Sequence, residues 1–210
     1  MFVFLFVLLT VLGAAAAGGM IVTERRRRLG AGAATPARAL PSGDALVERT
    51  VAELRVGDVV ILDGRDFLCE GTVGYDEAGH RWLGARVVDA ADVRWLYVGV
   101  ERTGGHGMVR LMTVDDSREV SGHPAETIVL GSVRYLQDRR GTATCKLSGD
   151  VGGLGGSQAG RPADHAERCR WWLYNAVGDD TLFVEQWGSD LRVLRGHKIA
   201  ESTIELIPGS

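Results

Sequence analysis

The sequence predicts a mainly β protein, with one N-terminal transmembrane α-helix followed by an antiparallel β-rich domain. The first 22 residues carry no charge, apolar and polar residues alternate from about residue 47 onward, and no long amphipathic helical pattern follows the opening run. These observations divide the chain into three parts: a transmembrane helix (1–23), a basic and Ala/Gly/Pro-rich linker (24–46) and a soluble β-rich domain (47–208).

The opening run is long enough to cross a bilayer. As a helix, Met1–Val22 would rise about 33 Å, and a hydrocarbon core is about 30 Å thick. Basic residues beside a transmembrane helix tend to stay in the cytoplasm. Four arginines follow the run and are expected to flank the membrane: Arg25, Arg26, Arg27 and Arg28. We therefore expect a single-pass protein of the inner membrane, with the soluble domain in the cytoplasm and lipid headgroups as partners of the arginines.

The alternative interpretation of this run is a cleaved signal peptide, which would leave a secreted β-domain. The small residues Ala14–Ala17 offer cleavage sites. No basic residue precedes the apolar run, however, and the arginine cluster follows it directly. Both features favour a retained anchor.

Alternation of apolar and polar residues predicts the strands of the domain. In Asp66–Tyr75 one face carries Phe67, Cys69, Gly71, Val73 and Tyr75. Aromatic and β-branched residues favour such pleated surfaces. Further strands are expected at 59–62, 81–89, 93–101, 108–114, 127–130, 133–138, 142–147, 168–176, 181–187, 191–194 and 203–207. A short helix is expected at 163–170, and Gly149–Gly160 is expected to be a surface loop.

Two segments of the domain resemble each other and predict two related β-meanders. Val60–Gly64 followed by Phe67 is similar to Ile128–Gly131 followed by Tyr135. The pairs Trp82-Leu83 and Trp172-Leu173 each precede a further apolar strand. Chance similarity between β-rich segments is the alternative explanation.

Charge and cysteine content exclude some functions. Residues 1–40 hold five of the 24 basic and one of the 27 acidic side chains, which leaves residues 41–210 with 19 basic and 26 acidic ones, a net charge of −7. Nucleic-acid binding requires a positive face, so no nucleic-acid partner is expected. The three cysteines do not suggest a disulfide framework.

No motif names a reaction. The glycine-rich stretch lacks the Lys-Ser/Thr pair of a phosphate-binding loop. His165 and Cys169 are close in sequence but have no further metal ligand nearby. We therefore expect no catalytic residue, cofactor or metal. The acidic pair Asp115-Asp116 is typical of a turn. Glu101 and Glu185 end similar strands, and with a histidine they could serve an enzyme of unassigned class with a β-cleft, which is the alternative function.

Aromatic residues supply the candidate partner-binding positions, which are Trp171, Trp172 and Trp187. Because Trp171 and Trp172 are adjacent, a strand would point their rings to opposite faces, so that one ring could be buried and the other exposed. An exposed aromatic patch would mark a partner site. Core packing is the alternative for each ring.

Gly, Trp and Tyr residues recur at fixed spacings along the domain, in Leu54-x-Val56-Gly57-Asp58, Gly64-x-x-Phe67, Tyr75-x-x-x-Gly79-x-x-Trp82, Trp95-Leu96-x-Val98, Trp172-x-Tyr174, Leu182-x-Val184-Glu185-x-Trp187-Gly188 and Gly196. This pattern resembles a bacterial domain-of-unknown-function family, number 4178, over roughly residues 48–208. The resemblance implies a β-rich bacterial domain, often near membranes and encoded beside membrane-stress coat proteins and polyamine-synthesis enzymes. It implies no established activity and no catalytic residues.

These observations favour a membrane-tethered, non-catalytic binding or accessory module in membrane stress or envelope maintenance. Its expected partners are the lipid bilayer and a protein at the membrane. Tethering would act by raising the effective concentration of the domain near that partner.

Overall fold

The computed structural model describes residues 49–102, 107–117, 123–154 and 166–209, all within the second of two units, Met1–Val47 and Glu48–Ser210. The predictions for residues 1–46, including the helix, the linker and Arg25–Arg28, lie outside the described residues. Within the described ranges, no helix is long and apolar enough to cross a membrane.

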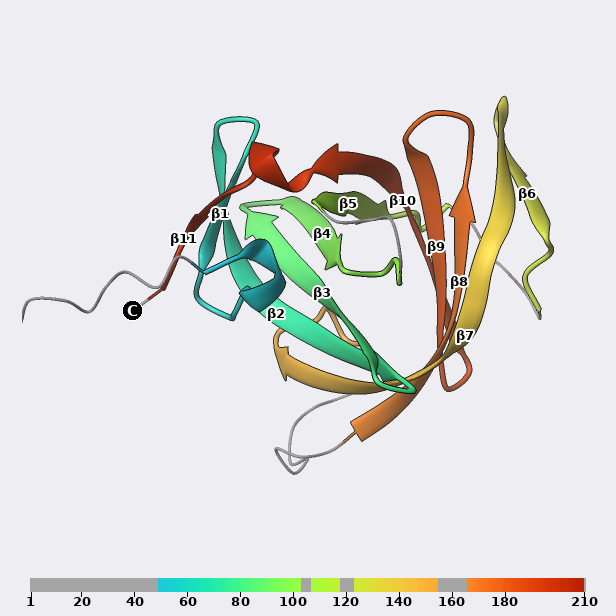
Figure 1. Ribbon diagram of the computed structural model, residues 1–210, viewed down its shortest axis with the longest axis horizontal. Coiled ribbons are helices and arrows are strands. Elements are labelled where there is room, and N and C mark those ends of the chain that lie inside the picture. The colour runs from blue at the N-terminus through green and yellow to red at the C-terminus, as the bar shows by residue number, and fades with distance from the viewer. Residues whose placement is uncertain (1–48, 103–106, 118–122, 155–165, 210) are drawn as a thin grey trace, which may run out of the picture. The chain divides into compact units, whose positions relative to one another are not determined.

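The described chain is one antiparallel sheet of eleven strands with two short 3-10 helices, which confirms the predicted mainly β class (Figure 1). The first half forms β1 (Val59–Leu62), β2 (Arg65–Glu77), β3 (His80–Asp89), β4 (Asp92–Val98) and β5 (Met108–Val114). The second half forms β6 (Thr127–Leu130), β7 (Val133–Gly149), β8 (Ala166–Asn175), β9 (Asp180–Trp187) and β10 (Asp190–Ala200). The remaining elements are η1 (Val51–Glu53), η2 (Glu201–Thr203) and β11 (Glu205–Ile207).

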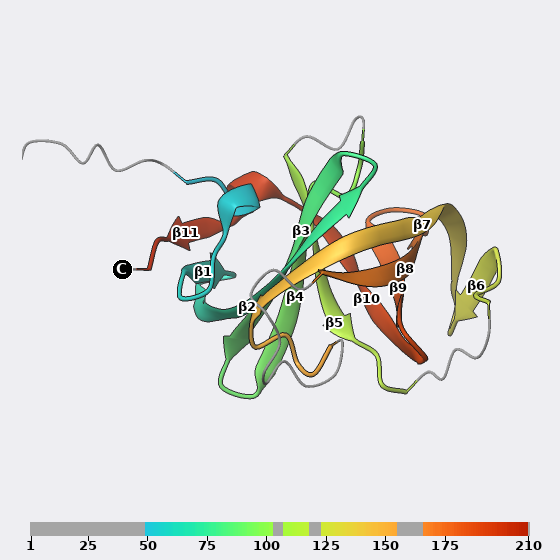
Figure 2. The same ribbon diagram turned by 90° about the horizontal axis from the view of Figure 1, so that it is seen from below.

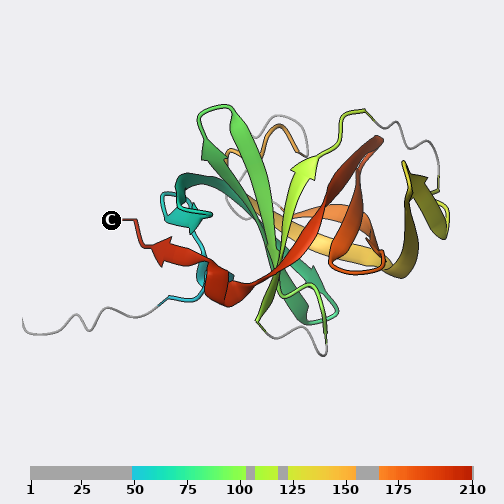
Figure 3. The same cartoon turned by 90° about the horizontal axis from the view of Figure 1, so that it is seen from above.

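Eight of the strands close on themselves. The sheet order is β11-β1-β2-β3-β4-β5-β10-β9-β8-β7-β6, and β2 also pairs with β7. Strands β2–β5 and β7–β10 therefore form a closed sheet, in which two four-stranded meanders meet at the β5–β10 and β2–β7 seams (Figures 2 and 3). The short strands β1, β6 and β11 lie outside the closure.

A β-bulge in each of the two longest strands redirects side chains from one face of the sheet to the other. The register shifts between Cys69 and Gly71 in β2 and between Gln137 and Arg139 in β7. An extra residue in one strand reverses the alternation beyond it. Phe67 and Cys69 consequently pack outside the closed sheet, while Val73 and Tyr75 pack inside it. The expectation that these residues share one face is therefore wrong.

Three core clusters result from this arrangement. One fills the closed sheet and takes residues from all eight of its strands. The second covers the outer face of the first meander with side chains from η1, β1 and β11, and the third covers the outer face of the second meander with Ile128, Leu130, Val133 and Tyr135. Each meander is thus buried on both faces.

Two local expectations differ from the structure. The helix expected at 163–170 is wrong where it is described, because Ala166–Arg170 belongs to β8, which pairs with β7. The strands expected at 133–138 and 142–147 form the single bulged strand β7. The bulge interrupts the alternation at Gln137, which is why the sequence suggests two strands.

Candidate functional site

A buried carboxylate joins four strands inside the closed sheet. Glu185, on β9, is fully buried. Its Oε1 accepts hydrogen bonds from the hydroxyl groups of Tyr75 (2.5 Å) and Tyr97 (3.1 Å), and its Oε2 accepts one from Nε1 of Trp187 (3.3 Å). Burial, together with the nearby negative charge of Glu185, raises the pKa of both tyrosines, so their hydroxyl groups stay protonated and donate.

Arg192, on β10, supplies the counter-charge. Its Nε donates to Oε2 of Glu185 (3.0 Å), and its Nη2 donates both to that oxygen and to the Tyr97 hydroxyl (2.9 Å). The guanidinium group lies over the ring of Trp95, 4.1 Å from its centroid. Burial lowers the pKa of Arg192, but the Glu185 charge more than offsets this, and the pKa is raised above its usual value. Arg192 therefore stays positively charged, and it is both hydrogen-bonded to Glu185 and stacked on Trp95.

The Arg192 side chain, which is 12% exposed, lies at one end of the closed sheet beside a pocket of about 490 Å³. The pocket is lined by the ends of three strands of the first meander, by the start of β10 and by the segment after β7. The lining residues are Arg86, Val93, Trp95, Val114, Asp115, Asp116, Val151, Gly152, Leu191, Arg192 and Val193. Ligand sites are typically such concavities, in which a few polar groups are set among apolar side chains. The pocket is therefore the candidate functional site.

The second arginine of the pocket is also neutralised. Arg86 donates through Nη1 to Glu70 and to Asp150 (3.3 Å). Ion pairs hold both guanidinium groups of the pocket, so neither contributes an uncompensated positive charge.

Two aspartates at the mouth have no such partner. Asp115 and Asp116 follow β5, and neither forms an ion pair with any described residue. Asp115 accepts hydrogen bonds from the backbone N–H and the hydroxyl group of Ser117, as a turn aspartate does. A second, polar pocket of about 530 Å³ shares both aspartates and adds Asp180, Arg195 and His197. The mouth is therefore acidic.

The two glutamates proposed for an enzymatic cleft lie in separate ion pairs. Glu101 accepts a hydrogen bond from Nη2 of Arg110, whose Nη1 donates to Thr181 and to Asn175 (3.1 Å). Glu185 pairs with Arg192 instead. Neither glutamate lines the two pockets described above.

The three candidate partner-binding tryptophans are core residues. Trp171, Trp172 and Trp187 are 3%, 2% and 5% exposed. As expected, the adjacent rings face opposite ways, Trp171 into the closed sheet and Trp172 into the outer cluster of the second meander. The β6–β7 hairpin buries Trp172, which leaves neither ring exposed. Their role in partner binding stays a prediction.

Metal ligands and thiols offer no second site in the described ranges. No group of three or more His, Cys, Asp or Glu side chains there could hold a metal ion, and His165 lies outside these ranges. Cys69, Cys145 and Cys169 are buried free thiols. Burial raises the pKa of Cys69 to about 12, so this thiol stays protonated at neutral pH.

The described residues thus form a closed antiparallel sheet with a polar pocket beside Arg192 and Trp95. The family model described as "Domain of unknown function (DUF4178)" matches residues 55–201, and the chain belongs to this family. The match confirms the family to which the spaced Gly, Trp and Tyr residues point. Neither the comparison with curated proteins nor the comparison with solved structures finds a match.

Sequence reasoning identified Glu185 but not the arginines of this site. Arg192 interrupts the apolar series Leu191–Leu194 and lies on the same face of the strand as Leu194. A charged residue on a buried face indicates a buried ion pair. Arg86 similarly interrupts the strand 81–89. Their convergence on one pocket depends on the seam between β5 and β10, which no local pattern reveals.

Proposed function

We propose that this protein is a membrane-tethered, non-catalytic binding module, whose closed sheet takes a small, positively charged ligand into the pocket above Arg192 and Trp95. The observation that carries the proposal is the charge distribution of the pocket. Glu185, Glu70 and Asp150 neutralise the two arginines, whereas Asp115 and Asp116 at the mouth form no ion pair within the described ranges. Acidic groups around a concave site raise the local concentration of cations.

The lining also defines the rest of the ligand. Val93 and Val114 give the pocket most of its apolar surface beside the carboxylates, while Trp95 and Val193, which are 1% and 4% exposed, lie at its base. A ligand with an ammonium group and a short apolar body would contact both. Because one face of the Trp95 ring is covered by Arg192, the ligand's charge is assigned to the aspartates rather than to that ring.

The tether is supported by the sequence. The uncharged run Met1–Val22 and the arginines after it favour a single-pass anchor with the domain on the cytoplasmic side of the inner membrane. A binding module held there would act on ligands or proteins at the membrane surface, including a protein partner in envelope maintenance. A full chain that is extracted from membranes by alkaline carbonate, without detergent, would argue against this tether.

Internal duplication is the proposed origin of the fold. Both halves contain a short strand, a long bulged strand and three further strands in the same order, and each bulge begins two residues after a buried aromatic residue, Phe67 or Tyr135. The buried rings Trp82 and Trp171 both face into the closed sheet.

Calorimetric titration of the detergent-solubilised full chain tests the pocket. Butylammonium and butyrate have similar apolar bodies and opposite charges, and we expect only butylammonium to bind. Asp116→Asn should weaken its binding about two- to fivefold, the usual range for one exposed ion pair. Glu126→Gln removes the same charge from the residue before β6, outside both pockets, and should leave binding unchanged. Equal binding of butyrate, or equal loss in Glu126→Gln, would refute the proposal.

A further inference from the structure

Among the described residues, no strand or helix covers the outer edge of β6. In the sheet order β6 stands at one end and β11 at the other, and β6 pairs only with β7 among the described residues. All three views place β6 on the opposite side of the domain from β1 and β11 (Figures 1–3). Its sequence, Thr127–Leu130, contains no charge and no proline. Such edges tend to pair with another strand, and most proteins protect them.

The other half of the molecule shows what this edge lacks. In the repeated topology β6 corresponds to β1, and β11 covers the outer edge of β1 through the pairs Val59–Ile207, Val60–Leu206 and Ile61–Glu205. The edge that β11 then exposes is protected by Glu205 and by Pro208 immediately after the strand. No described strand covers β6 in the same way.

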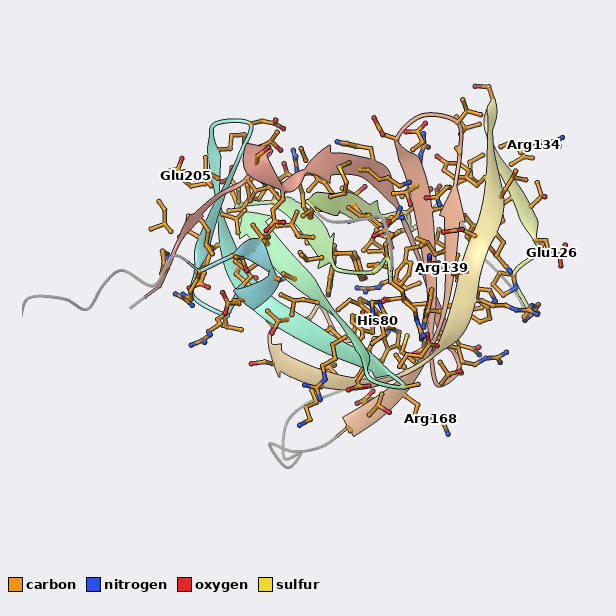
Figure 4. All side chains as sticks on the ribbon, viewed as in Figure 1. His80, Glu126, Arg134, Arg139, Arg168 and Glu205 are labelled. Atoms are coloured by element: carbon orange, nitrogen blue, oxygen red, sulfur yellow. The ribbon has the colours of Figure 1, made fainter. Side chains whose placement is uncertain are left out.

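The two faces of β6 differ in a way that suits a partner strand. Ile128 and Leu130 face inward and pack with the outer core cluster of the second meander. Val129 faces outward and is 55% exposed, as is Leu136 on β7, which pairs with Thr127 on the same face. Figure 4 labels Glu126, which precedes β6, and Arg134, which lies on β7 and pairs with Val129, so that β6 itself carries no charge.

We propose that β6 pairs antiparallel with β6 of a second copy of this chain, about a two-fold axis at Val129. This register places Thr127 opposite Gly131, Ile128 opposite Leu130, and Val129 opposite Val129 of the second copy. Residues opposite each other in a sheet lie on the same face. In this register each inward-facing side chain lies opposite an inward-facing one of the second copy, and each outward-facing side chain lies opposite an outward-facing one. The outer core cluster then continues across the axis through Ile128 and Leu130.

Self-complementarity selects a second copy over an unrelated strand. A strand without charge presents no group that calls for an opposite charge, and each of its apolar residues meets an apolar residue in this register. Four residues a side bury less than the roughly 1,000 Å² of a stable interface. The pairing is consequently weak in dilute solution and forms where copies are concentrated. It does not depend on the pocket or on its ligand.

Site-specific disulfide trapping tests the register in the full chain within membranes. Val129→Cys places two thiols at the axis, where opposed Cα atoms lie about 4.5–5.5 Å apart, within disulfide reach. Thr127→Cys is the matched control, because it is exposed on the same face but lies about 14 Å along the strands from its copy. After mild oxidation we expect about tenfold more covalent dimer from Val129→Cys than from Thr127→Cys.

The control separates this pairing from association through the N-terminal segment, which would bring both positions together without preference. Both residues are exposed, so neither substitution removes core contacts, and the native thiols are buried. Equal dimer yields, or no dimer from Val129→Cys, would overturn the proposal. A Val129→Cys adduct with a different protein would also overturn it and would assign the edge to a heterologous strand.

Discussion

Glu185→Gln is the sharpest test of what holds the closed sheet together. The carboxylate is fully buried and binds Arg192, Tyr75, Tyr97 and Trp187, which lie on β10, β2, β4 and β9. Glutamine has nearly the same shape but no charge, and its amide turns a donor toward groups that are themselves donors. Arg192 is then left as an uncompensated cation.

The magnitude follows from this burial. Removing one partner of a buried ion pair costs about 3–5 kcal/mol of the free energy of unfolding, because the remaining charge stays desolvated. For a domain of this size the corresponding fall in Tm is roughly 6–20 °C. Exposed Glu205→Gln, on β11, should change the free energy of unfolding by less than about 0.5 kcal/mol.

Urea unfolding of the detergent-solubilised full chain, followed by tryptophan fluorescence, measures both variants. Arg192→Met and the double variant complete a mutant cycle, in which the double variant should be less destabilised than the sum of the two single ones. A loss below about 1 kcal/mol for Glu185→Gln, or strict additivity, would refute the buried pair as the element that joins the strands.

Two further predictions concern packing and pH. Gly196→Ala should lower the free energy of unfolding in urea by about 1–3 kcal/mol, because the new Cβ would lie 1.9 Å from the Leu111 carbonyl oxygen. Gly74→Ala is the control and should be tolerated, because the nearest atom to its new Cβ is 3.9 Å away. Similar losses in both variants would contradict the β5–β10 seam. The raised pKa of Cys69 predicts stability that is fully present below about pH 9 and is lost as pH rises toward about 12, since only the unfolded state ionises in that range. Cys69→Ala should flatten the fall in the free energy of unfolding between these values, and an unchanged slope would contradict the assignment.

The sequence predicted the parts of this fold that depend on neighbours along the chain. Alternation located β2 and β7 most clearly, because buried and more exposed residues alternate along most of their length. The similarity between Val60–Gly64 and Ile128–Gly131, from which two related β-meanders were predicted, falls on the hairpins β1–β2 and β6–β7, and the duplication itself stays a proposal.

Features that depend on distant pairing were not predictable. The bulge in β2 moves Val73 and Tyr75 to the opposite face from Phe67 and Cys69, yet all four residues are buried. The sequence pattern of apolar residues is therefore the same whether or not a bulge reverses the faces. The β2–β7 and β5–β10 seams join segments with no local signal, and the pocket and the Glu185–Arg192 pair both depend on them. Trp172 looked available for a partner because the hairpin that covers it is remote in sequence.

The central claim is that a positively charged ligand enters the pocket above Arg192 and Trp95. Titration of the ¹⁵N-labelled full chain with butylammonium, monitored through the indole N–H resonances, tests it most directly, with Trp95→Phe to assign the signal. The account predicts that the Trp95 resonance shifts progressively while that of Trp172, in the outer core cluster, does not move. An unmoved Trp95 resonance, or an equal shift at Trp172, would contradict it.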